Sequence, residues 1–133
     1  MPRLPDWPDR LAAYIESRRH ARFVWGAHDC CRFAAGAVEA ITGDCVAGPW
    51  APCRSAIASM RALRAAGGIY EIPSACGFQR IPPALAGRGD IVATLTRRGP
   101  ALGVCLGADA AFAGTERLVF LPTLSSSAAW RIL

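Results

Sequence analysis

The spacing of apolar residues up to Gly43 predicts two amphipathic helices, because side chains three and four residues apart share one face of a helix. The apolar stripe of the first helix consists of Trp7, Leu11, Tyr14 and Ile15. Asp6 precedes this stripe as a candidate N-cap, and the basic run Arg18-Arg19-His20 suits the negative end of the helix dipole. The first helix should therefore begin after Asp6 and end near His20.

The second predicted helix carries the strongest apolar pattern in the chain. Its stripe consists of Cys30, Phe33, Ala34, Ala37, Val38 and Ile41. Asp29 stands before this stripe as a candidate N-cap, and Gly43 after it is the residue type that most often ends a helix. The pattern thus puts Cys30 in the first turn of the helix and on its buried face.

Beyond Gly43 the pattern is interrupted and its period changes. Residues 44–54 contain glycine and proline breakers and predict a loop. Ser55 can cap a third helix, which Gly67-Gly68 would end. Short apolar runs bounded by turn residues then predict strands at 91–95, 101–106, 110–113, 118–121 and 129–133. Helices followed by an antiparallel meander indicate one α+β domain over residues 1–133, with N-terminal helices packed on a C-terminal sheet.

Composition and charge narrow the classes of partner. All 15 basic residues are arginine and the net charge is +5, yet the arginines are scattered along the chain. A nucleic-acid protein more often clusters its basic residues among aromatic ones, so we expect no nucleic-acid partner. No stretch approaches the ~18 apolar residues of a membrane span, and residues 1–8 lack the apolar run of a signal peptide. The sequence therefore predicts a protein that is made in a cytoplasm without a signal peptide and that has no membrane span.

The six cysteines favour neither a metal nor another cofactor. They are Cys30, Cys31, Cys45, Cys53, Cys76 and Cys105. No two of them have the C-x-x-C spacing that is typical of zinc and iron–sulfur sites. A reducing compartment also disfavours disulfides, so most should be free thiols that pack as small apolar groups. A cysteine-bound metal or cluster stays a third and weaker alternative.

The segment Trp25-Gly26-Ala27-His28-Asp29-Cys30 is the chemically most suggestive part of the chain. The positive end of a helix dipole favours a thiolate, so a cysteine in the first helical turn is a candidate nucleophile. This segment resembles the nucleophile segment of the NlpC-type cell-wall peptidases, which are papain-like cysteine endopeptidases that cut peptidoglycan stem peptides. Two further landmarks follow in the family's order: Gly89-Asp90, and the stretch 101–107, where the family has His-x-Gly-x-x-x-Gly.

The resemblance implies a papain-like NlpC-type fold with Cys30 in the nucleophile position, but the position of the family's general base is Ala101. An alanine can neither take the thiol proton nor protonate a leaving amine. His28 is the candidate substitute base, because an extended lead-in would point it the same way as Cys30. Alternatively, His28 packs against or caps the Trp-Gly bend and bonds to Asp29. Asp109 could serve as the third, orienting polar residue, although it has no histidine to orient.

Two tryptophans are candidate binding residues. Trp25 is interpreted as a core residue or as the wall of a binding groove. Trp50 lies in the proline-rich loop and is either an interface anchor or part of the core.

The whole pattern is most similar to a small tail-assembly family of bacteriophages and prophages, which shares Trp-Gly-x-His-Asp-Cys, a Thr-Gly at the helix end (here Thr42-Gly43) and the Gly-Asp strand. This resemblance implies a tail-tip component that works as a degenerate, structural or binding module. Its partners would be tail-tip and hub proteins, with peptidoglycan as a further candidate. It would occupy the cytoplasm of the bacterial host during assembly and then the virion tail. The alternative function is an active cysteine endopeptidase that cleaves peptidoglycan stem peptides during phage DNA entry.

Overall fold

Two helices form where the apolar stripes predict them in the computed structural model, which describes residues 2–25, 27–46, 68–97 and 99–133. Helix α1 spans Trp7–Arg18, and α2 spans Cys30–Thr42. The Asp29 side chain caps α2 by accepting the Arg32 N–H at 2.8 Å, and Gly43 ends it with a left-handed φ of 80°. Asp6 precedes α1 as predicted, but its side chain makes no capping hydrogen bond.

Each predicted strand is present, although some ends differ. The strands that the sequence predicts are β2 (Ile91–Thr96), β3 (Gly99–Cys105), β4 (Asp109–Ala113), β5 (Leu118–Pro122) and β6 (Ala128–Arg131). Four elements are not predicted by the sequence pattern: the helix α5 (Glu71–Ala75), the strand β1 (Gln79–Ile81) and the short 3-10 helices η1 (Pro83–Leu85) and η2 (Thr123–Ser125). The predicted third helix lies outside the described residues, as does most of the loop before it.

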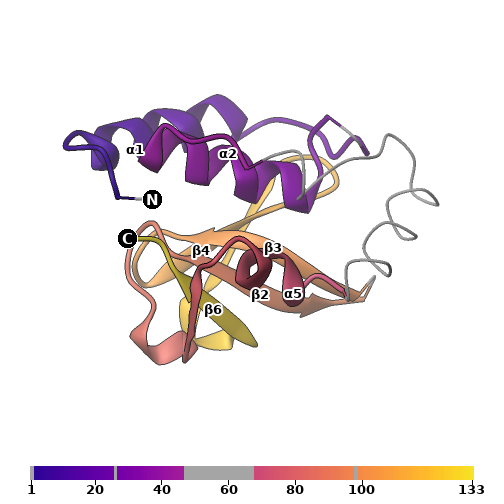
Figure 1. Cartoon of the computed structure of the whole chain (residues 1–133). Helices are drawn as coiled ribbons and strands as arrows, with labels where there is room; N and C mark the ends of the chain where they lie inside the picture. The colour runs from indigo at the N-terminus through magenta and orange to yellow at the C-terminus, as the bar shows by residue number, and fades with distance from the viewer. Residues whose placement is uncertain (1, 26, 47–67, 98) are drawn as a thin grey trace.

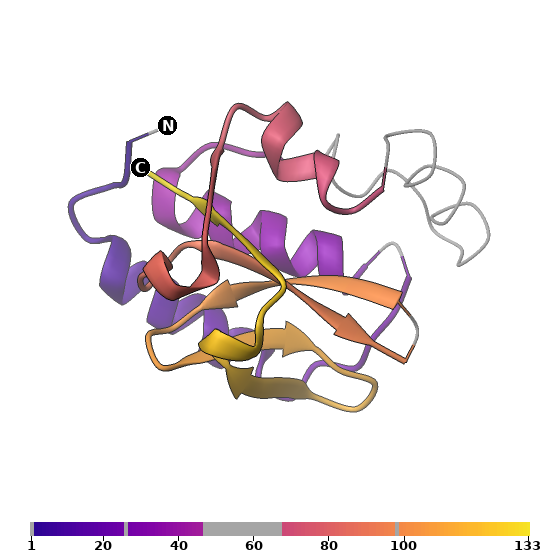
Figure 2. The same ribbon diagram turned by 90° about the horizontal axis from the view of Figure 1, so that it is seen from below.

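The strands of the described chain form one antiparallel sheet in the order β1-β6-β2-β3-β4-β5. The run from β2 to β5 is the predicted meander. The last strand departs from it: β6 crosses back to lie between β1 and β2, where Trp130 is opposite Ile91 and Arg80. Figures 1 and 2 show the two helices α1 and α2 stacked on one face of this sheet. The fold class is therefore α+β, as predicted.

Both faces of the central strands are buried, which explains why β2 reads as a continuous apolar run. Ile91 and Ala93 point into the main core, which α1 and α2 cover, whereas Val92 points into a second, smaller cluster on the opposite face. The second cluster consists of Ile81, Val92, Cys105, Ala110, Phe112 and Ala129. No helix in the described part of the chain is long and apolar enough to cross a membrane.

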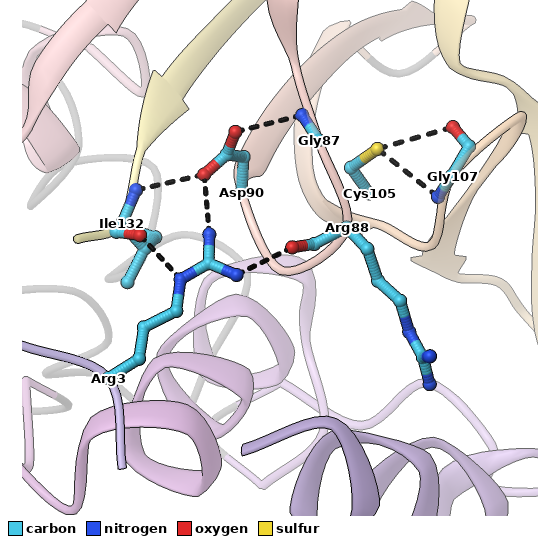
Figure 3. A network of polar contacts seen from close by, with 7 residues as sticks. All are labelled: Arg3, Gly87, Arg88, Asp90, Cys105, Gly107 and Ile132. Carbon is cyan, nitrogen blue, oxygen red and sulfur yellow. Dashed lines mark hydrogen bonds and ion pairs between the residues drawn. The ribbon is translucent and has the colours of Figure 1, made fainter. Parts of the chain in front are cut away.

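A buried carboxylate joins the two ends of the chain to the sheet. Asp90 immediately precedes β2 and is only 3% exposed. Its Oδ1 accepts hydrogen bonds from Arg3 Nη2 at 2.9 Å and from the Ile132 N–H at 3.0 Å, and its Oδ2 accepts the Gly87 N–H (Figure 3). Arg3 Nε also donates to the Ile132 carbonyl. The termini consequently lie side by side in both ribbon views.

Candidate functional site

Cys30 is the first residue of α2, and a tight turn delivers the chain to this point. Val24 and His28 form an isolated antiparallel bridge, with the His28 N–H donating to the Val24 carbonyl at 2.8 Å and the Val24 N–H donating back at 3.0 Å. Asp29 then adopts extended backbone angles and caps the helix. The predicted placement of a cysteine at the N-terminus of a helix is therefore confirmed.

The sulfur of Cys30 lies between α2 and β3. It is 4.0 Å from the sulfur of Cys31, and both side chains are buried. Hydrogen bonding from the Cys31 thiol lowers the pKa of Cys30, a backbone hydrogen bond with Leu102 on β3 lowers it further, and burial opposes both. The pKa of Cys31 is raised, first by the same thiol contact and then by burial. Of the two thiols, Cys30 is the one that is disposed to ionise.

The structure brings the strand with the predicted base position to Cys30. Cys30 contacts the backbone of Leu102, the residue after Ala101, and Ala101 is partly buried against the core cluster that includes Cys30. In the ladder Ala101 is opposite Thr94, and Leu102 is opposite Ala93. The position at which the resemblance expects a base is therefore one residue from the Cys30 contact, and its methyl side chain cannot accept a proton.

His28 does not take over the role of the base in this arrangement. Its side chain is only 4% exposed, and neither ring nitrogen has a hydrogen-bond partner among the described residues, so no bond joins it to Cys30 or Asp29. The ring instead meets Phe33 edge-on, with 5.9 Å between centroids. Burial lowers the pKa of His28, and the nearby Arg18 charge lowers it further. His28 is therefore a packed, neutral side chain, which fits its alternative interpretation as a packing residue but without the bond to Asp29.

Replacing His28 with leucine is expected to stabilise the protein by about 1–2 kcal/mol near pH 7.5, since it removes two buried polar atoms that lack partners. The substitution should also make the free energy of unfolding less dependent on pH. Because the folded pKa is depressed, the unfolded chain binds the proton more readily, so wild-type stability falls as the pH drops below about 6.5. Urea unfolding at pH 7.5 and pH 5 measures both effects.

The matched control is His20→Leu, because His20 is exposed and leaves the buried imidazole in place. The free energy of unfolding of this variant should depend on pH as that of wild type does. Two results together would contradict the packed and neutral state of His28. His28→Leu would be less stable than wild type at pH 7.5, and it would lose as much stability as wild type between pH 7.5 and pH 5.

Asp109 lies too far from Cys30 to act as the third, orienting residue. It begins β4, and the Leu106 N–H donates to its carbonyl at 2.8 Å, so it sits level with Leu106, the residue after β3. Leu102, which contacts Cys30, is four residues away, or about 13 Å along the strand. The register of β3 and β4, which the sequence does not reveal, separates the two positions.

The candidate binding residues and the remaining cysteines give no further site. Trp25 is half-buried and packs edge-on against Phe23 at 4.9 Å, whereas Trp50 lies outside the described residues. The described cysteines are free, with Cys30, Cys31 and Cys105 buried as predicted and Cys45 exposed. No group of three potential ligands that could hold a metal is found among the described residues.

Sequence reasoning missed two contributors to the surroundings of the sulfur. Cys31 was expected only to pack, and it is buried, but its thiol also makes the largest contribution to the lowered pKa of Cys30. The adjacent pair of cysteines was the available signal. The backbone of Leu102 contributes through its place on β3, and no residue type could have revealed that.

Comparison with known proteins gives one family. The model of a family described as a domain of unknown function, DUF6950, matches residues 2–132 of the chain. No curated protein matches the sequence.

Proposed function

Because this chain belongs to the DUF6950 family, a domain of unknown function, we propose its role from the site itself. The protein is a tail-tip assembly component of a bacteriophage or prophage. Its domain is a degenerate, papain-like NlpC-type peptidase fold that has lost its general base and acts as a structural and binding module. Its partners are other tail-tip and hub proteins.

One observation supports the proposed loss of peptidase activity. A thiol with a lowered pKa sits at a helix N-terminus and touches the strand of the expected base, but the side chain at that place is Ala101. The chain has only two histidines. His28 is buried without a hydrogen bond to Cys30, and His20 is an exposed residue after α1. Peptide cleavage needs a group that protonates the leaving amine, and no imidazole of this chain is placed to do so.

The fold and the tail assignment rest on different support. The order of helix, Cys30, Gly89-Asp90 and the strand with Ala101 agrees with the layout of the papain-like family, and the α+β architecture is compatible with it. The tail-tip role rests on the sequence motif around His28 and Cys30 and on Thr42-Gly43. A peptidase that has lost its base keeps its surfaces, and these are what an assembly component uses.

The proposal predicts that the purified protein releases no stem-peptide fragments from peptidoglycan sacculi. Wild type and Cys30→Ala should give the same muropeptides by mass spectrometry, because neither has a base. An active NlpC-type endopeptidase on the same sacculi is the positive control. In a prophage that encodes the chain, Cys30→Ala should leave tail assembly and infectivity at the wild-type level.

A second candidate function is the active endopeptidase, and the lowered pKa of Cys30 is the observation that favours it. It requires that a partner supplies the base or that His28 moves to the sulfur. New stem-peptide ends from wild type and none from Cys30→Ala would establish this alternative and overturn the binding-module proposal. Loss of infectivity in particles that still assemble with Cys30→Ala would point the same way.

A further inference from the structure

A groove of about 240 Å³ lies beside α1, at the end of β3 remote from Cys30. Its lining residues are Ala12, Ile15, Glu16, Arg19, Arg88 and Leu106. Three of them come from α1, Arg19 directly follows it, Arg88 precedes β2 and Leu106 follows β3. Leu106 is four residues beyond Leu102, so the groove is about 13 Å from the Cys30 contact along the strand. It is therefore separate from the degenerate peptidase site.

The polar rim of the groove carries an excess of positive charge. Arg88 is exposed, and its guanidinium makes only a 3.5 Å hydrogen bond to the Pro8 carbonyl, with no carboxylate in ion-pair distance among the described residues. Figure 3 shows this guanidinium pointing away from Asp90, which Arg3 already neutralises. Arg88 is thus a cation without a counter-charge at the edge of a hollow.

The second arginine is held only loosely. Arg19 pairs with Glu16 at 3.0 Å, but both side chains are largely exposed, and such pairs contribute little. An incoming carboxylate can therefore exchange with Glu16. The guanidinium of Arg19 also lies over the ring of Phe120 at 5.3 Å, and Phe120 is partly exposed on the edge strand β5. The positive rim continues in this way onto an apolar surface.

The floor of the groove is apolar, and the volume of the groove limits the size of a ligand that it can bind. Ile15 and Leu106 belong to or pack against the main core, so the base of the groove is preformed. Its volume is below the roughly 300–1,000 Å³ of pockets for drug-sized ligands. It accommodates a side chain rather than a whole metabolite, as anchor pockets in protein interfaces do.

We propose that this groove binds an acidic segment of a partner protein, with one aliphatic side chain on the floor formed by Ile15 and Leu106 and flanking carboxylates on Arg88 and Arg19. Arginine favours carboxylates because its planar group can donate two parallel hydrogen bonds to them. The net charge of +5 assists the approach of such a segment. This inference rests on the proposed binding role and names the chemistry of the partner.

Fluorescence polarisation of the full chain with a labelled peptide of alternating glutamate and leucine tests the proposal. Arg88→Gln should weaken binding at least about tenfold, the effect of losing a charge-assisted hydrogen bond. Arg97→Gln is the matched control, because this exposed arginine follows the last residue of β2, about 20 Å from the start of that strand. It should weaken binding about twofold at most, through net charge alone. Peptides with glutamine for glutamate, or alanine for leucine, should bind at least about tenfold more weakly.

Amide shifts in a two-dimensional NMR titration should be confined to α1, Arg88 and Leu106. Equal weakening by the two arginine variants would overturn the proposal, and so would shifts centred on Cys30 or no binding up to millimolar protein. A single-stranded oligonucleotide that competes in the same Arg88-dependent way would assign the groove to phosphates instead. Cleavage of sacculi would refute the binding-module function but would leave this result unchanged, so the two failures are distinguishable.

Discussion

Replacing Asp90 with asparagine is expected to lower the free energy of unfolding by about 3–5 kcal/mol, the usual cost of removing one partner of a buried ion pair. The carboxylate accepts three hydrogen bonds, two on Oδ1 and one on Oδ2. An asparagine amide has one oxygen, so its NH₂ group must face either the Gly87 N–H or the donors of Arg3 and Ile132. Arg3 would also lose its counter-charge. Urea unfolding followed by tryptophan fluorescence measures the loss.

Asp109→Asn is the matched control for this prediction. It makes the same chemical change at an exposed carboxylate, so its effect should stay within about 0.5 kcal/mol. If Asp90→Asn were within 1 kcal/mol of wild type, the contacts of Asp90 would not be holding the termini. The free energy of unfolding of a typical domain is about 5–15 kcal/mol. If this domain is near the lower value, the Asp90→Asn variant would retain little stability.

The role of Asp90 also explains one landmark of the resemblance in physical terms. The Gly-Asp pair stands directly before β2. In the structure Asp90 pairs with Arg3 and so links the N-terminal segment and the last residues of the chain to the start of the sheet. In this chain the Gly-Asp pair thus has an architectural role.

What the sequence predicted well was determined locally. Helix α2 has its own cap at Asp29, its own stop at Gly43 and an uninterrupted apolar stripe, so both its ends and the place of Cys30 were readable. The strands β2 to β5 are joined by short turns, and their pairing follows from the order in the chain. Local signals of this kind do not depend on the rest of the fold.

What the sequence missed depends on contacts between distant segments. Strand β1 has only three residues, two of them polar and exposed, and it exists because it pairs with β6 fifty residues later. Helix α5 has five residues and contains Pro73, so it is too short for a periodic pattern. The crossing of β6 back to β2 likewise leaves no local signal.

The predictions for the candidate site differ in the same way, between local signals and contacts of distant segments. Asp109 was plausible as an acidic residue after the base strand, but the register of β3 and β4 puts it level with Leu106. His28 was plausible by its spacing from Cys30, but the bridge to Val24 and the packing on Phe33 turn it into a core residue. Residue type and spacing suggested the chemistry, and the tertiary packing decided which groups can meet.

Replacing Gly103 with alanine should lower the free energy of unfolding by about 3 kcal/mol, at the upper end of what overpacking costs. A Cβ at this position would come closer than 3.0 Å to the Ala111 carbonyl oxygen and to the ring of Phe112. The ring of Phe112 can shift, but the carbonyl is held in the ladder between β3 and β4, so the clash cannot be relieved without moving a strand. Thermal or urea unfolding of the variant measures the effect.

The control is Gly87→Ala, where the added methyl group would meet only Asp90 Oδ2 at an ordinary 3.9 Å. The Gly87 N–H that donates to Asp90 is retained, so this change should alter stability by no more than about 0.5 kcal/mol. Equal stabilities for the two variants would mean that β4 does not lie as close to β3 as the structure has it. Because β3 also carries Leu102 to the Cys30 sulfur, Gly103→Ala should expose the buried thiol as well. Faster alkylation of Cys30 in this variant than in Gly87→Ala would report the displaced strand directly.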